Sequence, residues 1–434
     1  MPGTSPVYRG ASLAARGALA LLAGLDPKLS RGHRGRVASL AEFQRWAAAS
    51  RDRNRPLLWF HAPSVGEGLQ ASTVITRLRS GHPDWQFAYT YFSPSAESFA
   101  AKLPVDVTGY LPYDLAAPAE TLLDALQPTA LIFSKLDLWP EVATRAAARG
   151  VPVALIAATV RPGSGRLRWP VRPLLAPGYR SVSAAGAIAA EDAERLATLG
   201  VPAERIQVLG DPRFDSVAER VAAVPADDPL LRFGGGGDVL VAGSTWPGDE
   251  AVLLGAFHRV RERHPAARLI LVPHEPRPDH LGQIEQRAAA HGLPTPVRLS
   301  NAEGPVPLLL VDRTGVLAAL YGAGSMAFVG GGFHSAGLHS VLEPAAWGRP
   351  VAFGPRWRES RDAGLLITAG GGRAITSDVE SAAIQAMAAI WLEWIGNPAG
   401  REQEGARGLA VVQGGLGAAG RAATMVESLV TAPR

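Results

Sequence analysis

The chain has 434 residues, 47% of them hydrophobic and 19% charged, which excludes a disordered protein and is enough for two or three folded domains. It contains no cysteine, so disulfide bonds and thiolate metal sites are excluded. The net charge is only +4, and the arginines are scattered rather than clustered with aromatic residues, which argues against binding to nucleic acid.

The first predicted element is a short apolar helix near the N-terminus. Its apolar run, residues 17–25, lies between Arg16 and Asp26 and is shorter than the ~20 apolar residues that a membrane-spanning helix needs. No small-residue cleavage site separates it from the basic residues at 31–36, so a cleaved signal peptide fits poorly. We expect residues 1–36 either to lie in the interface of an anionic membrane or to pack on the protein's own core.

Residues 37–222 alternate short apolar runs with amphipathic stretches, which is the pattern of a parallel sheet with crossover helices. The predicted strands are 57–61, 85–92, 130–133, 152–158, 185–190 and 206–210, and the predicted helices include 66–78, 120–126 and 191–199. This range is assigned to a first α/β domain.

The alternation stops in a stretch rich in proline and glycine, residues 223–237, which we predict to be a linker. It resumes in residues 238–434, with predicted strands at 239–244, 268–272, 308–311, 326–329 and 350–353 and one or two helices in 405–429. The predicted fold class is α/β, with two doubly wound Rossmann-like domains facing an interdomain cleft. Ligands bind at the carboxyl ends of strands in such sheets, so we expect the site residues to converge there.

Three predicted strand ends in the second domain carry glycine-rich or polar loops. After strand 326–329, a glycine-rich loop precedes a predicted helix with Ser340 as N-cap, and the first turn of that helix would hold a phosphate. Taken singly, such loops are more often turns or helix caps, but three at one sheet edge favour a nucleotide site. Its candidate residues are Ser244, Thr245, His274, Arg277, Gly331, Gly332, His339, Ser340 and Glu343.

In the first domain, Glu67 follows the first predicted strand at the start of a helix. A carboxylate in that position is a candidate general base for transfer to a hydroxyl group. The alternative is a first-turn glutamate that only complements the helix dipole. No closely spaced set of His, Asp and Glu residues has the pattern of a metal site, so we expect no catalytic metal.

Several short segments carry a resemblance to a known family: Ser64-Val-Gly-Glu67, Leu111-Pro-Tyr-Asp114, Asp137-Leu-Trp-Pro140, Gly210-Asp-Pro-Arg-Phe-Asp215, Phe328-Val-Gly-Gly331 and Leu342-Glu-Pro344. Through these segments and their order, most of the chain resembles the 3-deoxy-D-manno-octulosonic acid (Kdo) transferases, which build the inner core of lipopolysaccharide. The resemblance implies a GT-B-type glycosyltransferase with Glu67 as the catalytic base.

The resemblance also implies the substrates: CMP-Kdo as donor, a lipid A precursor as acceptor, and an inverting, metal-independent transfer without a cofactor. It assigns residues 37–222 to acceptor binding, with Ser64, Lys135 and Asp137 as candidates, and residues 238–434 to the nucleotide sugar. Arg213 is a further donor-side candidate. A lipid acceptor implies a peripheral or shallowly anchored protein at the cytoplasmic face of the bacterial inner membrane, with residues 1–36 at its surface.

Four departures from the family pattern bear on the substrates. Where the family usually has Glu-Thr-Glu, this chain has Lys135-Leu-Asp137. Trp246 stands where the family has histidine, Ser340 replaces an asparagine, and the family's Pro-Arg-His is Pro273-His-Glu. Two alternatives therefore stay open. One is another GT-B nucleotide-sugar transferase or epimerase with a different donor or acceptor, and the other is a catalytically silent, lipid-binding homologue.

Overall fold

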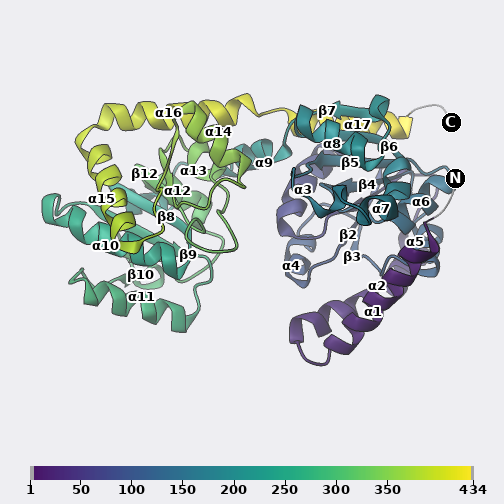
Figure 1. Ribbon diagram of the computed structural model, residues 1–434, viewed down its shortest axis with the longest axis horizontal. Coiled ribbons are helices and arrows are strands. Elements are labelled where there is room, and N and C mark those ends of the chain that lie inside the picture. Colours follow the sequence, from purple (N-terminus) through teal and green to yellow (C-terminus); the bar gives the residue numbers. More distant parts are fainter. Residues whose placement is uncertain (1–3, 432–434) are drawn as a thin grey trace. The chain divides into compact units, whose positions relative to one another are not determined.

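The structure is a computed structural model that describes residues 4–431. The chain forms two compact units (Figure 1), one made of Met1–Ser216 with Leu416–Arg434 and the other of Val217–Gly415. Each unit contains one seven-stranded parallel sheet, as the alternating sequence pattern predicts.

The sheet of the first unit has the order β3-β2-β1-β4-β5-β6-β7. Its strands are β1 (Leu57–His61), β2 (Gln86–Tyr91), β3 (Val107–Tyr110), β4 (Ala130–Ser134), β5 (Val153–Ala158), β6 (Val182–Ala187) and β7 (Ile206–Val208). The helices are α1 (Pro6–Leu22), α2 (Pro27–Ser50), α3 (Val65–Gly81), α4 (Glu97–Ala100), α5 (Ala116–Leu126), α6 (Pro140–Ala148), α7 (Val171–Arg180), α8 (Ala190–Leu199) and α17 (Ala418–Thr431). Helix α9 (Pro212–Ala222) carries the chain into the second unit.

Both faces of this sheet are covered, which explains why its strands read as continuous apolar runs. Successive residues of β1 point to opposite sides, since Leu57 and Trp59 belong to one apolar cluster and Leu58 and Phe60 to another. The polar residue His61 ends the strand and is itself fully buried.

The sheet of the second unit has the order β10-β11-β9-β8-β12-β13-β14. Its strands are β8 (Val239–Thr245), β9 (Arg268–Pro273), β10 (Val297–Arg298), β11 (Leu308–Leu310), β12 (Met326–Val329), β13 (Val351–Phe353) and β14 (Gly372–Ala374). The helices are α10 (Pro247–Arg263), α11 (Pro278–Ala290), α12 (Leu317–Ala323), α13 (Leu342–Ala346), α14 (Arg361–Ala369), α15 (Glu380–Gly396) and α16 (Pro398–Gly414).

The chain changes from one side of the first strand to the other between β1 and β4 in the first sheet and between β8 and β12 in the second. Open α/β sheets bind ligands at the carboxyl ends of the strands beside such a reversal. The fold therefore predicts a ligand site in the loops that follow β1, β4, β8 and β12.

The observed division differs from the predicted domain boundaries in two places. The predicted linker, residues 223–237, lies inside the second unit, where Phe233 is buried. The predicted second domain extended to residue 434, whereas α17 belongs to the first unit and packs on α3. The physical reason is the apolar face of α17, because Ala419, Met425 and Val426 are buried in the same cluster as core residues of α3.

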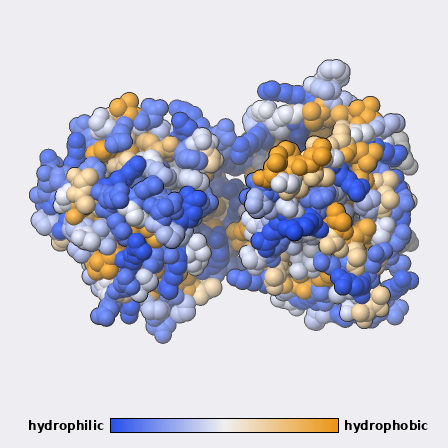
Figure 2. Space-filling view, turned by 90° about the horizontal axis from the view of Figure 1, so that it is seen from below, coloured by the Kyte–Doolittle hydropathy of each residue, from blue (hydrophilic) through white to orange (hydrophobic). Residues whose placement is uncertain are grey.

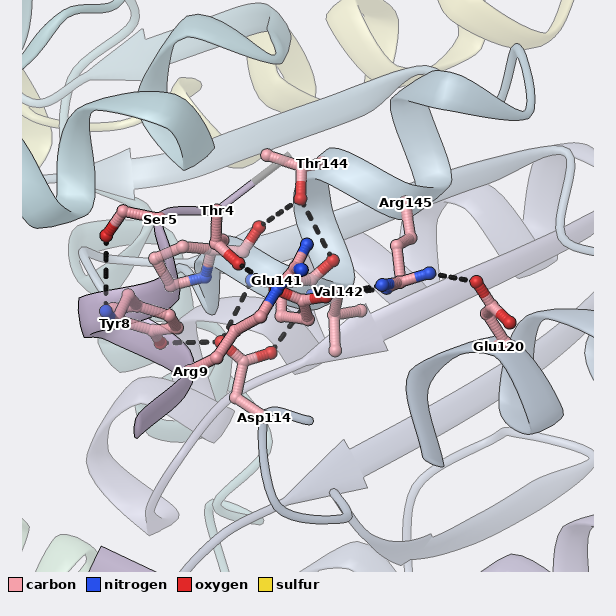
Figure 3. A network of polar contacts seen from close by, with 11 residues as sticks. Thr4, Ser5, Tyr8, Arg9, Asp114, Glu120, Glu141, Val142, Thr144 and Arg145 are labelled. Atoms are coloured by element: carbon pink, nitrogen blue, oxygen red, sulfur yellow. Dashed lines mark hydrogen bonds and ion pairs between the residues drawn. The ribbon is translucent and has the colours of Figure 1, made fainter. Parts of the chain in front are cut away.

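Helices α1 and α2 form a hairpin at the N-terminal end, and none of the residues of α1 is buried. The helix is held at its first turn by polar contacts (Figure 3). The Tyr8 hydroxyl donates to Asp114 at 2.6 Å, and Thr4 and Arg9 both donate to the buried carboxylate of Glu141. Polar contacts rather than core packing therefore fix α1.

Asp114 also joins this anchor to the first turn of α6. It accepts hydrogen bonds of 2.9 Å from the backbone N–H groups of Glu141 and Val142. Burial raises the pKa of Asp114 to about 6, against the opposing effect of these hydrogen bonds and that of Tyr8. The segment from Leu111 to Asp114 is thus explained by a structural role.

The rest of the hairpin exposes apolar side chains. Leu13 is 56% exposed, Leu21 80% and Leu25 83%, and apolar side chains gather over this hairpin in the view from below (Figure 2). No helix within residues 4–431 has the length and apolar character needed to cross a membrane.

Candidate active site

Glu67 lies in the first turn of α3, directly after β1 and beside the strand reversal of the first sheet. The Ser64 hydroxyl donates a hydrogen bond to the Glu67 carboxylate instead of capping the helix backbone. Lys135, which follows β4, donates a hydrogen bond of 2.9 Å from Nζ to the other carboxylate oxygen. The structure therefore brings together three of the predicted residues around one carboxylate.

The backbone of Lys135 is in the left-handed region, with φ of 64°. A residue with a side chain pays roughly 1 to 2 kcal/mol for that conformation. Here it directs the ammonium group back across the ends of β4 and β1 to Glu67, and the Lys135 N–H donates to the carbonyl oxygen of Ile156 at 2.8 Å. The position of the cation is thus set by the turn and not only by the flexible side chain.

The surroundings of Glu67 favour its ionised form. Burial by itself would raise the pKa of the carboxyl group, but the hydrogen bonds from Ser64 and Lys135 and the charge of Lys135 outweigh burial and lower it. The side chain is 17% exposed, so a substrate can reach it. Glu67 is accordingly an accessible carboxylate that is deprotonated at neutral pH.

Asp137 forms a second polar cluster at the same carboxyl end of the sheet. Its carboxylate is 3.0 Å from Nε2 of His61 and accepts a hydrogen bond of 3.1 Å from the indole of Trp139. The other ring nitrogen of His61 is 3.0 Å from the Thr90 hydroxyl. Burial would raise the pKa of Asp137, but the hydrogen bond to His61 and the other contacts lower it. Sequence analysis missed His61, although a polar residue at the end of an otherwise apolar strand was a signal.

In the second unit, the ends of β8 and β9 form a small open depression. Nine residues line it, and three of them, Thr245, His274 and Arg277, were predicted donor residues; the acidic Glu275 and Asp279 line it as well. The buried Thr245 hydroxyl donates to Glu250 at 3.1 Å. Ser244, beside it, has a left-handed φ of 54°. The two loops do meet, as their positions after neighbouring strands require.

Trp246 is the centre of an aromatic cluster that includes three histidines. The ring of His334 stacks on it in parallel, with centroids 4.1 Å apart, and His274 stacks at 4.9 Å. The indole N–H of Trp246 donates to Nε2 of His339 at 3.0 Å. Burial and the two neighbouring histidines lower the pKa of His339 to about 4, so this ring is neutral and can accept that bond. His274 and His339 were among the predicted site residues, whereas His334 and Trp246 were not.

The glycine-rich loop after β12 is fixed to the start of α10 by Asp249. One carboxylate oxygen accepts hydrogen bonds from the N–H groups of Gly331 at 2.8 Å and Trp246 at 2.9 Å, and the other from Phe333 at 3.3 Å. Burial raises the pKa of Asp249 to about 6, against the effect of these bonds. Asp249 was not predicted, although an acidic residue three positions after the start of a helix often caps it.

The glycines of this loop are required by the protein's own backbone. Gly331 has φ of 93°, and a Cβ atom there would overlap the carbonyl oxygen of Gly337. A Cβ atom on Gly332 would lie 2.5 Å from the backbone nitrogen of Gly354. The loop therefore packs closely on two neighbouring segments, which is a structural use of the glycines.

Four predicted donor residues have other surroundings than expected. Ser340 is not an N-cap, because α13 begins after Val341, without a side-chain cap, and is only five residues long. Glu343 pairs with Arg220 at 2.5 Å, and Arg277 pairs with Glu275 at 3.7 Å on the exposed surface. Arg213 lies in the first unit, where it pairs with Asp211 at 2.6 Å. The cap failed because the helix begins one residue later than predicted, which puts Val341 at the N-cap position and leaves Ser340 outside the helix.

No group of three or more His, Asp or Glu side chains in the described part of the chain is arranged to hold a metal ion. At the strand reversal of each unit, the polar groups form hydrogen bonds with other residues of the same unit. Glu67 in the first unit is an ionised carboxylate, and the cluster around Trp246 in the second unit offers aromatic rings and the neutral imidazole of His339.

The chain is similar in sequence to known proteins. The family model described as 3-deoxy-D-manno-octulosonic-acid transferase (kdotransferase) matches residues 40–216, the range that contains Glu67, Lys135 and Asp137. A 3-deoxy-D-manno-octulosonic acid transferase of Aquifex aeolicus is 29% identical over 307 residues, which are 70% of this chain and 78% of the relative.

Solved structures with the same architecture have much lower sequence identity. A UDP-GlcNAc 2-epimerase from Neisseria meningitidis aligns with a TM-score of 0.60 and 12% identity, over 86% of this chain and all of that one. A glycosyltransferase from Rickettsia africae aligns with a TM-score of 0.57 and 10% identity, over 88% of this chain and all of that one. These likenesses establish the GT-B-type fold alone.

Proposed function

We propose that the chain is a member of the 3-deoxy-D-manno-octulosonic acid (Kdo) transferase family and that it transfers Kdo from CMP-Kdo to a hydroxyl group of a lipid A precursor. The family model that matches residues 40–216 and the similarity to the relative from Aquifex aeolicus support this proposal. The observation that carries this proposal is the environment of Glu67. An ionised, accessible carboxylate stands at the strand reversal of the unit that contains the family match. That is the group which transfer to a hydroxyl needs.

In the proposed reaction, Glu67 accepts the proton of the acceptor hydroxyl as its oxygen attacks the anomeric carbon of Kdo. The new glycosidic bond forms while the bond from the anomeric carbon to the CMP phosphate breaks, and the electron pair leaves with CMP. Attack opposite to the leaving group inverts the configuration. Ser64 and Lys135 hold the carboxylate in place, and Lys135 lowers its basicity through its charge.

The donor is proposed to bind in the second unit, at the ends of β8, β9 and β12. Ser244, Thr245, His274, Arg277 and the glycine-rich loop are the proposed phosphate contacts, with Glu343 for the ribose. Support comes from the depression at the ends of β8 and β9, which Thr245, His274 and Arg277 line. A cation such as Arg277 stabilises the charge on a departing phosphate.

The acceptor is proposed to bind in the first unit, near Ser64, Lys135 and Asp137. A lipid acceptor also gives the exposed hairpin of α1 and α2 a role. Its leucines and flanking arginines have the composition of a segment that lies in an anionic membrane interface, and α1 buries no residue in the core. We therefore propose a peripheral protein at the cytoplasmic face of the bacterial inner membrane.

Transfer from freshly generated CMP-Kdo to a tetraacylated lipid A precursor tests this function. Wild type and Glu67→Ala are compared, each with and without a metal chelator. Product from wild type alone, undiminished by the chelator, is the expected result. Absence of product from wild type despite CMP binding would overturn the assigned acceptor, and loss of product with the chelator would overturn metal independence.

A further inference from the structure

The loop between β5 and α7 exposes a tryptophan between two arginines. Trp169 is 85% exposed, far more than any other described tryptophan, and Arg168 and Arg172 beside it are exposed as well. A tryptophan ring carries a large apolar surface that gains free energy when it is removed from water. Such a ring on the surface, with charged neighbours, is typical of residues that contact a ligand.

The base of this loop is fixed beside the candidate active site. Arg166 lies 4.0 Å from Asp137, which in turn contacts His61 at the end of β1. The start of the loop is held by Asp192, which accepts a hydrogen bond of 2.7 Å from the N–H of Val160. Strand β5 neighbours β4, and β4 neighbours β1, so this loop leaves the same sheet edge as Glu67.

Arg168 in this loop and Arg172 in the first turn of α7 have charge available for a ligand. Arg166 is occupied by Asp137, whereas neither Arg168 nor Arg172 has a carboxylate within ion-pair distance among residues 4–431. The N–H of Arg172 donates to the carbonyl oxygen of Arg168 at 2.8 Å, so the two residues are one helical turn apart. Like charges at that spacing repel each other, and an anion between them relieves the repulsion.

We propose that Arg168, Trp169 and Arg172 form a recognition site for a phosphorylated sugar, and that through it the enzyme holds the head group of its acceptor. The inference rests on the proposed function. Guanidinium groups bind phosphate through paired hydrogen bonds, and the apolar face of a sugar ring packs against an indole. The site thereby selects acceptors that carry a phosphate group.

An anionic membrane surface is the competing occupant, because tryptophan and arginine also lie at membrane interfaces. The position of the loop favours the acceptor. Its Arg166 pairs with Asp137, at the end of the sheet that carries Glu67. The exposed leucines that suit a membrane lie instead on the α1–α2 hairpin. The experiment below separates the two occupants.

The test measures steady-state transfer with the lipid A precursor in detergent micelles, before and after enzymatic removal of its phosphate groups. The variants are Trp169→Ala and the double variant Arg168→Gln with Arg172→Gln. Arg180→Gln, at the exposed far end of α7, is the matched control for loss of charge. The double variant is expected to raise the KM of the phosphorylated acceptor at least about tenfold, with the donor KM unchanged, because it loses charge-assisted hydrogen bonds.

Wild type is expected to prefer the phosphorylated acceptor, and the double variant to lose that preference. An equal loss with both acceptors would overturn the phosphate role. A loss seen only on anionic vesicles, and not in micelles, would assign the loop to the membrane instead. Binding of a phosphorylated glucosamine, followed by saturation-transfer NMR, separates this inference from the proposed function. If neither wild type nor any variant transfers Kdo, the phosphorylated glucosamine is still expected to bind wild type and not the double variant. Equal binding to both proteins would overturn the inference.

Discussion

Replacement of Glu67 by glutamine removes one negative charge and leaves the shape of the side chain nearly unchanged. The structural cost is small. Lys135 is 42% exposed and Glu67 17%, so solvent screens the pair, and its loss is expected to lower the free energy of unfolding by about 1 kcal/mol or less. The Ser64 hydroxyl can still donate to the amide oxygen.

The catalytic cost is expected to be much larger. A general base contributes roughly 10² to 10⁴ in rate, which is about 2.7 to 5.4 kcal/mol of activation free energy. Glu67→Gln should therefore reduce kcat by at least about 10²-fold, a change that the small loss of stability cannot produce. Initial rates with saturating CMP-Kdo and lipid A precursor measure the first quantity, and thermal unfolding measures the second.

Glu427→Gln is the matched control for this substitution. Glu427 is a partly exposed carboxylate on α17 that lies 3.1 Å from His82, so its replacement by glutamine also removes a negative charge that contacts a basic side chain. We expect a similarly small loss of stability and an unchanged kcat. A Glu67→Gln variant that retains activity within about tenfold of wild type would refute Glu67 as the base.

Three further predictions concern the charge, the loop and the hairpin. Lys135→Met removes the cation that lowers the pKa of Glu67, so the acid limb of the kcat/KM profile should move to higher pH; a limb that stays in place would contradict the assignment. Gly331→Ala should lower the melting temperature more than Gly337→Ala, because both have positive φ but only the first meets backbone; equal melting temperatures would argue against this packing. Leu21→Glu should weaken cosedimentation with anionic vesicles while thermal unfolding is unchanged, since the side chain is 80% exposed; undiminished binding would exclude the hairpin as the membrane contact.

The inner strands of both sheets could be read from the sequence, but three of the four edge strands could not. The exception is the edge strand Ile206–Val208, which was predicted as 206–210. Leu57–His61 was predicted with the ends that the structure shows, because burial on both faces makes the whole strand apolar. The strands missed, Val107–Tyr110, Val297–Arg298 and Gly372–Ala374, all lie at sheet edges. An edge strand is partly exposed, so its sequence lacks the continuous apolar run that identified the others.

The positions of the candidate residues at the strand reversals followed from the βα alternation, but their partners did not. The Lys135 side chain meets Glu67 across two strands that are far apart in sequence, so no local pattern could indicate the contact. The same holds for Asp249, whose partners in the glycine-rich loop lie more than eighty residues away. The assignment of Ser340 as an N-cap failed because the first residue of the following helix depends on how the loop packs.

The discontinuous first unit has a consequence for the order of events during synthesis on the ribosome. Domains generally fold as they emerge, the N-terminal one first. Here Ala419, Ala422 and Val426 of α17 complete an apolar cluster with strands from residues 58 to 184. The Asp215 carboxylate accepts hydrogen bonds from the N–H groups of Gly417 and Ala419, which are synthesised about 200 residues later. The unit that begins first can therefore finish only after helix α17 has been synthesised, whereas all residues of Val217–Gly415 are made before that helix. Until then, the apolar residues of α3 that α17 covers are exposed on the nascent chain, where a chaperone can bind them.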